Sequence, residues 1–191
     1  GLLGNNVVRE LLHRQLRPRV LVRETSDPRP LEGLDVDLVY GDIRDAAAVE
    51  AACQGVDVVI HAAGYVKIGW SDREFHQAIN VEGAANVARA IHQEQGRLVH
   101  VSTVNTLGVA GPNQVADEES VKQPIILCPY VETKRAAEEE IHRLVQEGLD
   151  AVIVQPAFML GPWDWKPENA TNVCQRGTLA KRVRLPEGRA I

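Results

Sequence analysis

The chain has 191 residues, of which 45% are hydrophobic, and this length is enough for one sizeable domain core. Its 21 Lys and Arg against 26 Asp and Glu give a formal net charge of −5, which argues against a general nucleic-acid or membrane-surface binder. No apolar run approaches the roughly 20 residues of a membrane-spanning helix, and no signal-peptide pattern opens the chain. We therefore expect a cytoplasmic protein with no nucleic-acid or membrane partner.

Cysteine and histidine do not form the clusters that a disulfide framework or a metal site needs. Cys53, Cys128 and Cys174 are odd in number and far apart, so we expect reduced thiols. The six histidines are scattered, with no H-x-x-x-H pair and no nearby cysteine pair. We therefore expect no bound metal.

Short β-branched runs alternate with helical patterns along the chain. The expected strands are residues 19–23, 36–40, 56–61, 98–101 and 151–155, and the expected helices are residues 5–15, 46–53, 71–95 and 129–146. Asp45 is expected to cap the short helix, and Ser71-x-x-Glu74 to form a capping box that opens the long one. The alternation predicts an α/β fold, a Rossmann-like doubly wound parallel sheet with helices on both faces.

Distinctive residues follow the expected strands at their carboxyl ends, where ligands bind in such sheets. These residues are Arg23, Asp42, His61-Ala62-Ala63, Ser102-Thr103 and Pro156. We therefore expect a binding crevice at this edge of the sheet. His61 itself is interpreted as a structural histidine.

The first four residues, Gly1-Leu2-Leu3-Gly4, precede a helical pattern and look like the tail of a phosphate-binding turn. Glycine lets the backbone approach a pyrophosphate, and the N–H groups at a helix N-terminus receive its charge. A plain tight turn is the alternative. The strand that such a turn follows would precede Gly1 and lie at the centre of the sheet. We therefore expect the sequence to be a fragment, or to omit residues.

The residues after the next two strands bear on the choice of cofactor. Arg23 stands 19 positions after Gly4 (23 − 4), where an arginine can meet the 2′-phosphate of NADP. NADP(H) is therefore favoured, and the adjacent Glu24 keeps NAD(H) open. Asp42 and Ile43 are candidates for holding the adenine, with the carboxylate on its amino group and the apolar side chain on its face. An ordinary loop aspartate is the alternative.

Tyr130 and Lys134 are four residues apart on an expected helix, so they share one face. A free tyrosine has a pKa of about 10, and a nearby ammonium should lower that pKa toward working pH. Ser102 or Thr103 could hold a substrate oxygen at the strand end. Asn80 is a poor helix former, and it could bend the long helix and hold a water in a proton relay. The alternative in each case is an ordinary exposed or strand-end polar residue.

In order and spacing, the motifs resemble the extended short-chain dehydrogenase/reductases, also called the NAD-dependent epimerase/dehydratase family. They are G-L-L-G, L-V-R, G-D-I-R-D, H-A-A-G, N-V-E-G, V-S-T, Y-V-E-T-K and Q-P-A-F-M-L-G-P, from Gly1 to Pro162. Within the family, V-L-V-R-x-T-S-D-P-R-P-L-E-G-L and G-P-W-D-W-K-P look most like the dihydroflavonol-reductase-like branch.

The resemblance implies a catalytic group of Thr103, Tyr130 and Lys134, assisted by Asn80. Thr103 fits better than Ser102, because it stands five residues before a glycine, as in the S/T-x-x-x-x-G pattern of the family. The resemblance further implies that Lys134 binds the nicotinamide ribose. Residues that would line the cofactor are Ala62, Ala63 and Pro156.

The implied function is an NAD(P)-dependent oxidoreductase that transfers a hydride between nicotinamide and a carbonyl or secondary alcohol carbon. A nucleotide-sugar epimerase with tightly bound NAD uses the same residues and is the first alternative. A non-catalytic NADP-binding sensor or interaction protein is the second. Val104-Asn105 stand where sugar-nucleotide dehydratases carry Asp-Glu, which speaks against dehydration.

The resemblance also divides the chain. Residues 1–160 are expected to form the NAD(P)-binding Rossmann domain, and residues 161–191 the start of an incomplete substrate-binding portion. Two departures stand out: the first glycine of the G-x-x-G-x-x-G turn is not in the sequence, and Gln155 replaces the usual Arg or Asn before the proline. Separately, the Glu138-Glu139-Glu140 run is interpreted as a solvated face. Family members often dimerise through the helices that correspond to residues 71–95 and 129–146, so a homodimer is open.

Overall fold

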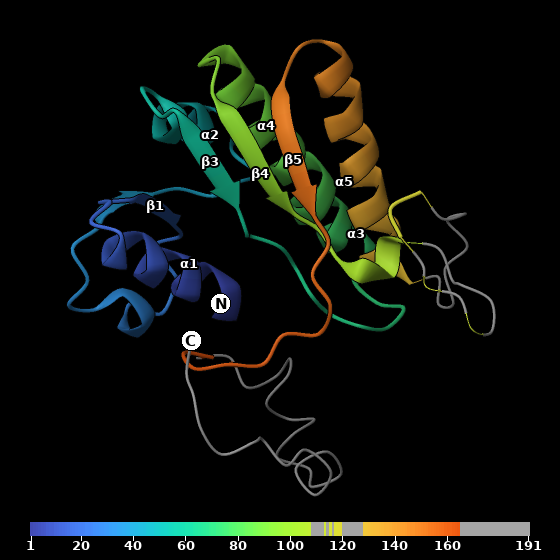
Figure 1. Cartoon of the computed structure of the whole chain (residues 1–191), viewed down its shortest axis with the longest axis horizontal. Coiled ribbons are helices and arrows are strands. Elements are labelled where there is room, and N and C mark those ends of the chain that lie inside the picture. The colour runs from blue at the N-terminus through green and yellow to red at the C-terminus, as the bar shows by residue number, and fades with distance from the viewer. Residues whose placement is uncertain (108–112, 114, 116, 120–127, 165–191) are drawn as a thin grey trace, which may run out of the picture.

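The computed structural model describes residues 1–107, 113, 115, 117–119 and 128–164 (Figure 1). The helices are α1 (Leu2–His13), α2 (Ala46–Cys53), α3 (Arg73–His76), α4 (Gly83–Gln93) and α5 (Pro129–Gln146). The strands are β1 (Arg19–Val22), β2 (Asp37–Tyr40), β3 (Val58–His61), β4 (Arg97–Val101) and β5 (Asp150–Val154). The 3₁₀ turns η1 (Arg29–Leu31) and η3 (Val104–Thr106) and the π-helical segment η2 (Gln77–Glu82) complete the described elements.

The expected helices and strands are all present, but one predicted cap is wrong. The Asp45 carboxylate caps α2 as predicted, accepting from the N–H groups of Ala47 and Ala48 at 3.0 and 3.3 Å. The Ser71 capping box does not form, because α3 begins one residue later, after a left-handed Asp72 with φ 61°. The Asp72 carboxylate does not cap α3; it accepts from Lys67 at 2.5 Å and from the Tyr65 hydroxyl at 3.0 Å.

All strand pairs are parallel, which confirms the α/β fold (Figure 1). In the described residues the strands form two sheets, β1-β2 and β3-β4-β5. Each of β1 and β3 therefore has one edge without a strand partner in this part of the chain.

Helices α4 and α5 pack against the β3-β4-β5 sheet, α2 packs against α4, and α1 lies beside β1 (Figure 1). The core between helices and sheet contains Val49, Cys53, Val87, Ala88, Ala90, Ile91, Leu98, Ile141, Leu144 and Leu149. The turn from α4 into β4 requires glycine, because a Cβ on Gly96 would lie 2.4 Å from Ile91 Cδ1 and 2.8 Å from the Asp57 carbonyl oxygen. Over the described residues, no helix combines the length and apolarity needed to cross a bilayer.

The opposite face of the β3-β4-β5 sheet is apolar but exposed in the described residues. Val58 on β3 and Val152 on β5 are 51% and 46% exposed, and Ile60 and Val154 are exposed beside them. The helical cover of this sheet is therefore on one face within the described part of the chain. Most of residues 161–191, the expected substrate-binding portion, lie outside it.

Candidate active site

Three polar side chains lie one helical turn apart on the buried face of α5. Tyr130, Lys134 and Glu138 are 8%, 4% and 1% exposed. The four-residue spacing places them in one row along the helix, and the row faces the carboxyl ends of β4 and β5. The interpretation of Glu138-Glu139-Glu140 as a solvated face is therefore wrong for Glu138, which is buried. Of the three glutamates, only Glu139 is exposed.

Lys134 is held by the carboxyl end of β4. Its Nζ donates to the Val101 carbonyl oxygen at 2.7 Å and lies 3.4 Å from His100 Nε2. Burial lowers the pKa of Lys134 to about 8, and the charge of Glu138 acts in the opposite direction. The ammonium is therefore present at neutral pH and is lost in mildly alkaline solution.

His61 and His100 flank this ammonium with their ring centroids 5.3 Å apart. Burial, reinforced by the Lys134 charge, lowers the pKa of His61 to about 3 and that of His100 to about 2. Both imidazoles are therefore neutral at physiological pH. This environment suits a structural rather than an acid–base role for His61.

The pKa of Tyr130 departs from the sequence expectation. Burial raises it above the ordinary value, and a hydrogen bond with the Thr103 side chain opposes the rise. The predicted lowering by Lys134 is wrong for this structure, because the effect of burying the phenol dominates. Tyr130 is therefore a protonated phenol near neutral pH.

Of the two hydroxyls that follow β4, Thr103 is the one that meets Tyr130. Thr103 is 7% exposed and caps η3, where its Oγ1 accepts from the Asn105 N–H at 3.3 Å. Ser102 instead donates its hydroxyl hydrogen to Glu138. The strand end thus supplies one hydroxyl to the phenol and one to the buried carboxylate.

Asn80 is 2% exposed and lies in the π-helical segment η2, so the solvent-facing alternative is wrong. Its Oδ1 accepts from the Tyr65 N–H at 2.8 Å, and its Nδ2 donates to the Tyr65 carbonyl at 3.1 Å. The same Nδ2 reaches Thr133 Oγ1 on α5 at 3.2 Å and His76 Nδ1 at 3.3 Å. Asn80 thus ties the loop after β3 to the helix that carries Tyr130. Its role in a proton relay stays a prediction.

The glycine-containing start of the chain forms the N-terminus of α1. Gly1 is the N-cap, and Leu2, Leu3 and Gly4 belong to the first turn, so the expected turn lies within the helix rather than before it. A Cβ at Gly1 or Gly4 would meet no atom within 4 Å. The helix end therefore offers open space beside N–H groups, which fits the chemistry of an anionic phosphate.

The candidates after β1 and β2 lie near one another, with a difference from expectation. Arg23 is exposed. The pKa of Asp42 is lowered to about 2, mainly by the hydrogen bond from Arg44, and the charge of Arg23 contributes to this lowering. The Asp42 carboxylate is held by Arg44 Nε and Nη2 at 3.0 and 2.7 Å. Ile43 packs onto α4, where a Cβ on Gly83 would lie 2.7 Å from Ile43 Cδ1. Both side chains thus have partners within the protein.

The other candidates for contact with the cofactor stand at aligned strand ends. Ala62 and Ala63 follow β3, and Pro156 follows β5 after Gln155. The Pro156 carbonyl accepts from the Val104 N–H at 3.0 Å, which joins the segment after β5 to the one after β4. Ala63 is exposed, whereas Ala62 and Pro156 are half-buried.

Sequence reasoning missed Glu138, Gln155 and His76 as members of this site. Glu138 could have been found from its spacing, because it continues the row of Tyr130 and Lys134 by one more turn. His76 likewise stands four residues before Asn80, with its ring centroid 6.3 Å from that of Tyr130. Gln155 was noted only as a departure from the family.

Some expectations cannot be compared with the structure. Gly108, the glycine five residues after Thr103, and Cys174 lie outside the described residues. Cys53 and Cys128 are buried free thiols. Searched over the described ranges alone, the structure has no group of three or more His, Cys, Asp or Glu arranged to hold a metal. The absence of metal stays a prediction for the whole chain.

Parallel strands joined by helices, with a buried phenol and ammonium at their carboxyl ends, define an α/β protein of the Rossmann type. The sequence profile of the NAD dependent epimerase/dehydratase family matches residues 1–182, which is nearly the whole chain. The chain belongs to this family. The resemblance seen in the motifs is thereby confirmed.

Curated relatives agree with this assignment. A Synechocystis sp. protein named "Putative dihydroflavonol 4-reductase" is 38% identical over 171 residues, 87% of this chain and 49% of that protein. "Sterol demethylase protein B" of Methylococcus capsulatus is 35% identical over 173 residues, 87% of this chain and 51% of that protein. The chain thus spans about half the length of the curated relatives that it matches.

Solved structures share the fold. The crystal structure of gox2253 has a TM-score of 0.81 and 32% identity, covering 91% of this chain and 53% of that one. The UDP-glucose 4-epimerase of Thermus thermophilus, solved in complex with NAD, has a TM-score of 0.70 and 28% identity over 80% of this chain and 50% of that one.

Proposed function

We propose that this chain forms the catalytic half of an NAD(P)-dependent oxidoreductase acting on a carbonyl or secondary alcohol. The observation that carries the proposal is the burial of Thr103, Tyr130 and Lys134 near the carboxyl ends of the strands, in a member of an NAD-dependent family. The relatives named dihydroflavonol reductase and ketoreductase support a reductase. Residues 1–160 would be the cofactor-binding domain and residues 161–191 the start of the substrate portion.

In the reductive direction, the chain's own residues handle the proton. The nicotinamide supplies the hydride when it is bound. Tyr130 Oη would donate its proton to the carbonyl oxygen, and the raised pKa keeps the phenol protonated for that step. The Thr103 hydroxyl would orient the same oxygen, and the charge of Lys134 would stabilise the phenolate left behind. Asn80 would hold the water that returns a proton.

The cofactor would lie across the carboxyl ends of the strands. The start of α1, Gly1 to Gly4, would receive the pyrophosphate, and Arg23 the 2′-phosphate of NADP. Ala62, Ala63 and Pro156 would line the nicotinamide half, and Lys134 would bind its ribose. Asp42 is less free to hold adenine than the sequence suggested, because Arg44 already engages its carboxylate. NADP(H) is favoured over NAD(H).

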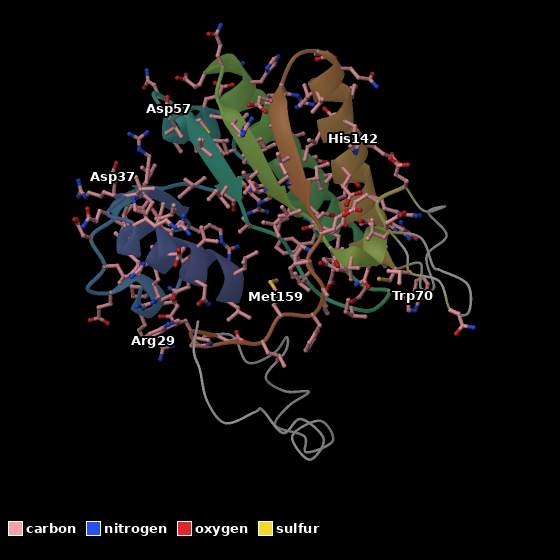
Figure 2. The ribbon with its side chains drawn as sticks, in the orientation of Figure 1. Arg29, Asp37, Asp57, Trp70, His142 and Met159 are labelled. Atoms are coloured by element: carbon pink, nitrogen blue, oxygen red, sulfur yellow. The ribbon has the colours of Figure 1, made fainter. Side chains whose placement is uncertain are left out.

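Exposed apolar side chains support a substrate with an apolar body. Ile68 and Trp70, in the segment after β3, are 66% and 73% exposed, and Phe158 and Leu160, after β5, are 64% and 55% exposed. Figure 2 shows Trp70 and Met159 in the half of the molecule toward which β3 to β5 point. Water-exposed apolar groups of this size beside a polar site suit an apolar ligand.

A nucleotide-sugar epimerase with tightly held NAD is the second candidate. The similarity to UDP-glucose 4-epimerase favours it. Its polar substrate would suit the apolar segments less well. A non-catalytic sensor ranks third, because the site keeps both Tyr130 and Lys134.

In each case a cytoplasmic homodimer is proposed, and the groove between α4 and α5, lined by Val81, Ala85 and Ala136 among others, would lie at its interface.

Calorimetric titration of the full-length protein with NADP(H) and with NAD(H), after a check for bound cofactor, tests this proposal. We expect NADP(H) to bind more tightly, and Arg23→Ala to weaken it roughly 10- to 100-fold through the lost charged hydrogen bonds. Arg14→Ala is the matched control, because Arg14 is also exposed but pairs with Glu10 at the far end of α1. Prebound NAD with no response to NADP(H) would favour the epimerase, and binding of neither would refute the cofactor assignment.

Turnover separates the enzymatic candidates from the sensor. A screen of apolar ketones with NADPH should find activity that Tyr130→Phe lowers by at least about 100-fold, since the proton donor is lost. Cofactor affinity should change little in the same variant. Equal turnover of Tyr130→Phe and the parent protein would contradict the role given to the phenol.

A further inference from the structure

Glu138 is a carboxylate with almost no contact with solvent, two helical turns after Tyr130. It is 1% exposed, and burying a charge is expensive unless hydrogen bonds satisfy it. Its Oε1 accepts from Thr106 Oγ1 at 2.7 Å, from Gln155 Nε2 at 3.1 Å and from the Ser102 hydroxyl. Three side chains within hydrogen-bonding distance of one carboxylate oxygen form a shared network.

These donors surround Thr103. Ser102 precedes it and Thr106 follows it in the same turn, where Thr106 Oγ1 also lies 2.8 Å from the Thr103 carbonyl oxygen. Gln155, at the end of β5, donates to Thr106 Oγ1 at 2.9 Å and so links the two strand ends. Glu138 therefore fixes the backbone on both sides of the hydroxyl that meets Tyr130.

Glu138 also acts on Lys134 through its charge. The groups that face the Lys134 ammonium are His61 from β3, His100 from β4, and Tyr130 and Glu138 from α5. Both histidines and the phenol are neutral near pH 7, and Glu138 is the acidic side chain of this set. Its charge raises the pKa of Lys134 against the effect of burial.

We propose that Glu138, one helical turn after Lys134 on α5, is a positioning residue that holds Thr103 against Tyr130. The proposal rests on the function proposed above for these three residues, and it assigns to one carboxylate the alignment of all of them. Glu138 itself touches no reacting atom, because its carboxylate is enclosed by Ser102, Thr106 and Gln155.

The test compares Glu138→Gln with Glu139→Gln, which removes the same charge from the exposed neighbour. Glutamine keeps the size of the side chain and one carbonyl acceptor, so the variant should fold. The first readout needs no turnover: NMR titration of the lysine side chains, of which the sequence has only five, with Lys134→Arg to assign the signal. We expect Glu138→Gln to lower the pKa of Lys134 by about one unit and Glu139→Gln to leave it unchanged.

The second readout is the exchange of the Asn105 amide, whose N–H donates to Thr103 Oγ1. It should exchange faster in Glu138→Gln than in Glu139→Gln. The third is turnover: kcat should fall by about ten-fold with KM for the cofactor nearly unchanged, and the alkaline limit of kcat should move to lower pH.

The outcomes separate this proposal from the proposed function. Unchanged Lys134 titration and Asn105 exchange in Glu138→Gln would overturn the positioning role, whether or not the parent protein turns over. Absence of turnover in the parent protein, with both NMR changes present, would refute the enzyme assignment and leave the role of Glu138 in the site supported. A kcat equal to that of Glu139→Gln would also overturn it.

Discussion

At the scale of single residues, the site is made of polar groups that water does not reach. Lys134, Glu138, Asn80, His61 and His100 are each at most 5% exposed. Leaving such groups unpaired would cost several kcal/mol each, on the order expected for buried polar atoms. Hydrogen bonds to strand-end carbonyls, hydroxyls and amides offset that cost for Lys134, Glu138 and Asn80, whereas His100 Nδ1 is buried with no hydrogen-bond partner among the described residues. The same arrangement makes the stability of the protein sensitive to pH.

The histidine pair predicts a loss of stability in mild acid. Folding lowers the pKa of His61 and His100 from 6.5 to about 3 and about 2. Above pH 6.5 the two imidazoles are neutral in both the folded and the unfolded chain, so their contribution to the free energy of unfolding is fully present. Below pH 6.5 only the unfolded chain binds protons at these imidazoles, so the free energy of unfolding falls as the pH drops toward 3. The free energy of unfolding should fall by about 1.4 kcal/mol per pH unit for each histidine.

Urea unfolding between pH 5 and pH 7.5 measures this slope. His61→Gln should reduce this slope, because it removes one of the buried histidines whose pKa folding lowers, which also include His76 and His100. His142→Gln is the control: His142 lies exposed on α5, away from the pair (Figure 2). A slope that is the same in His61→Gln and in the parent protein would show that acid acts on other groups.

At the scale of elements, local rules predicted most of what they govern directly. Alternation of β-branched runs and helical patterns gave every strand and long helix, and Asp45 caps α2 as its spacing indicates. Ser71 is not the cap, because α3 begins after Asp72 and not after Ser71. Asp72 is itself bound by Lys67 and Tyr65. Spacing likewise put Tyr130 and Lys134 on one face, but the pKa of the phenol depends on burial by elements distant in sequence.

Asn80 illustrates the same limit and gives a second prediction. Its two bonds to the Tyr65 backbone cross 15 residues and are invisible to local patterns. Asn80→Ala should destabilise the protein by about 1–3 kcal/mol, the usual effect of leaving a buried hydrogen-bonding group unpaired. The Tyr65 amide should exchange with solvent at least about ten-fold faster, because its acceptor is lost.

Asn86→Ala is the matched control for this change, since Asn86 lies two turns further along the same helical segment. It donates from Nδ2 to the Ile43 carbonyl at 3.0 Å and has no part in the Tyr65 loop. Hydrogen-exchange NMR should therefore find the Tyr65 amide protected in Asn86→Ala. Protection that persists in Asn80→Ala would mean that ring contacts of Tyr65 with Phe75 and His76 hold the loop.

At the scale of the whole molecule, the described chain has a well-paired sheet and a less supported one. Strand β4 is paired on both edges, by β3 and by β5, and it lies against the main core. Strands β1 and β2 pair only with each other. Arg19 on β1 joins them to α2 by donating to the carbonyls of Ala52 and Gln54 at 3.0 and 2.9 Å. Two-stranded sheets are marginally stable alone, so this pair depends on such links.

For the chain of residues 1–191, we therefore expect the two sheets to open at different free energies. Native-state hydrogen exchange in increasing urea should give β4 amides, such as those of Leu98 and His100, an opening free energy close to that of global unfolding. The amides of β1 and β2, such as that of Leu38, should open at a free energy lower by about 2 kcal/mol, or roughly 30-fold in the open fraction.

Equal values for both sheets would instead require that the α1–β1–β2 part and the β3–β4–β5 part unfold as one cooperative unit. In that case the contacts of Arg19, together with the packing of Leu21 against the main core, would transmit the stability of one sheet to the other. Arg19→Met separates these cases, because it removes the polar link from an exposed position and keeps the apolar stem. It should lower the opening free energy of β1 and β2 while leaving that of β4 unchanged.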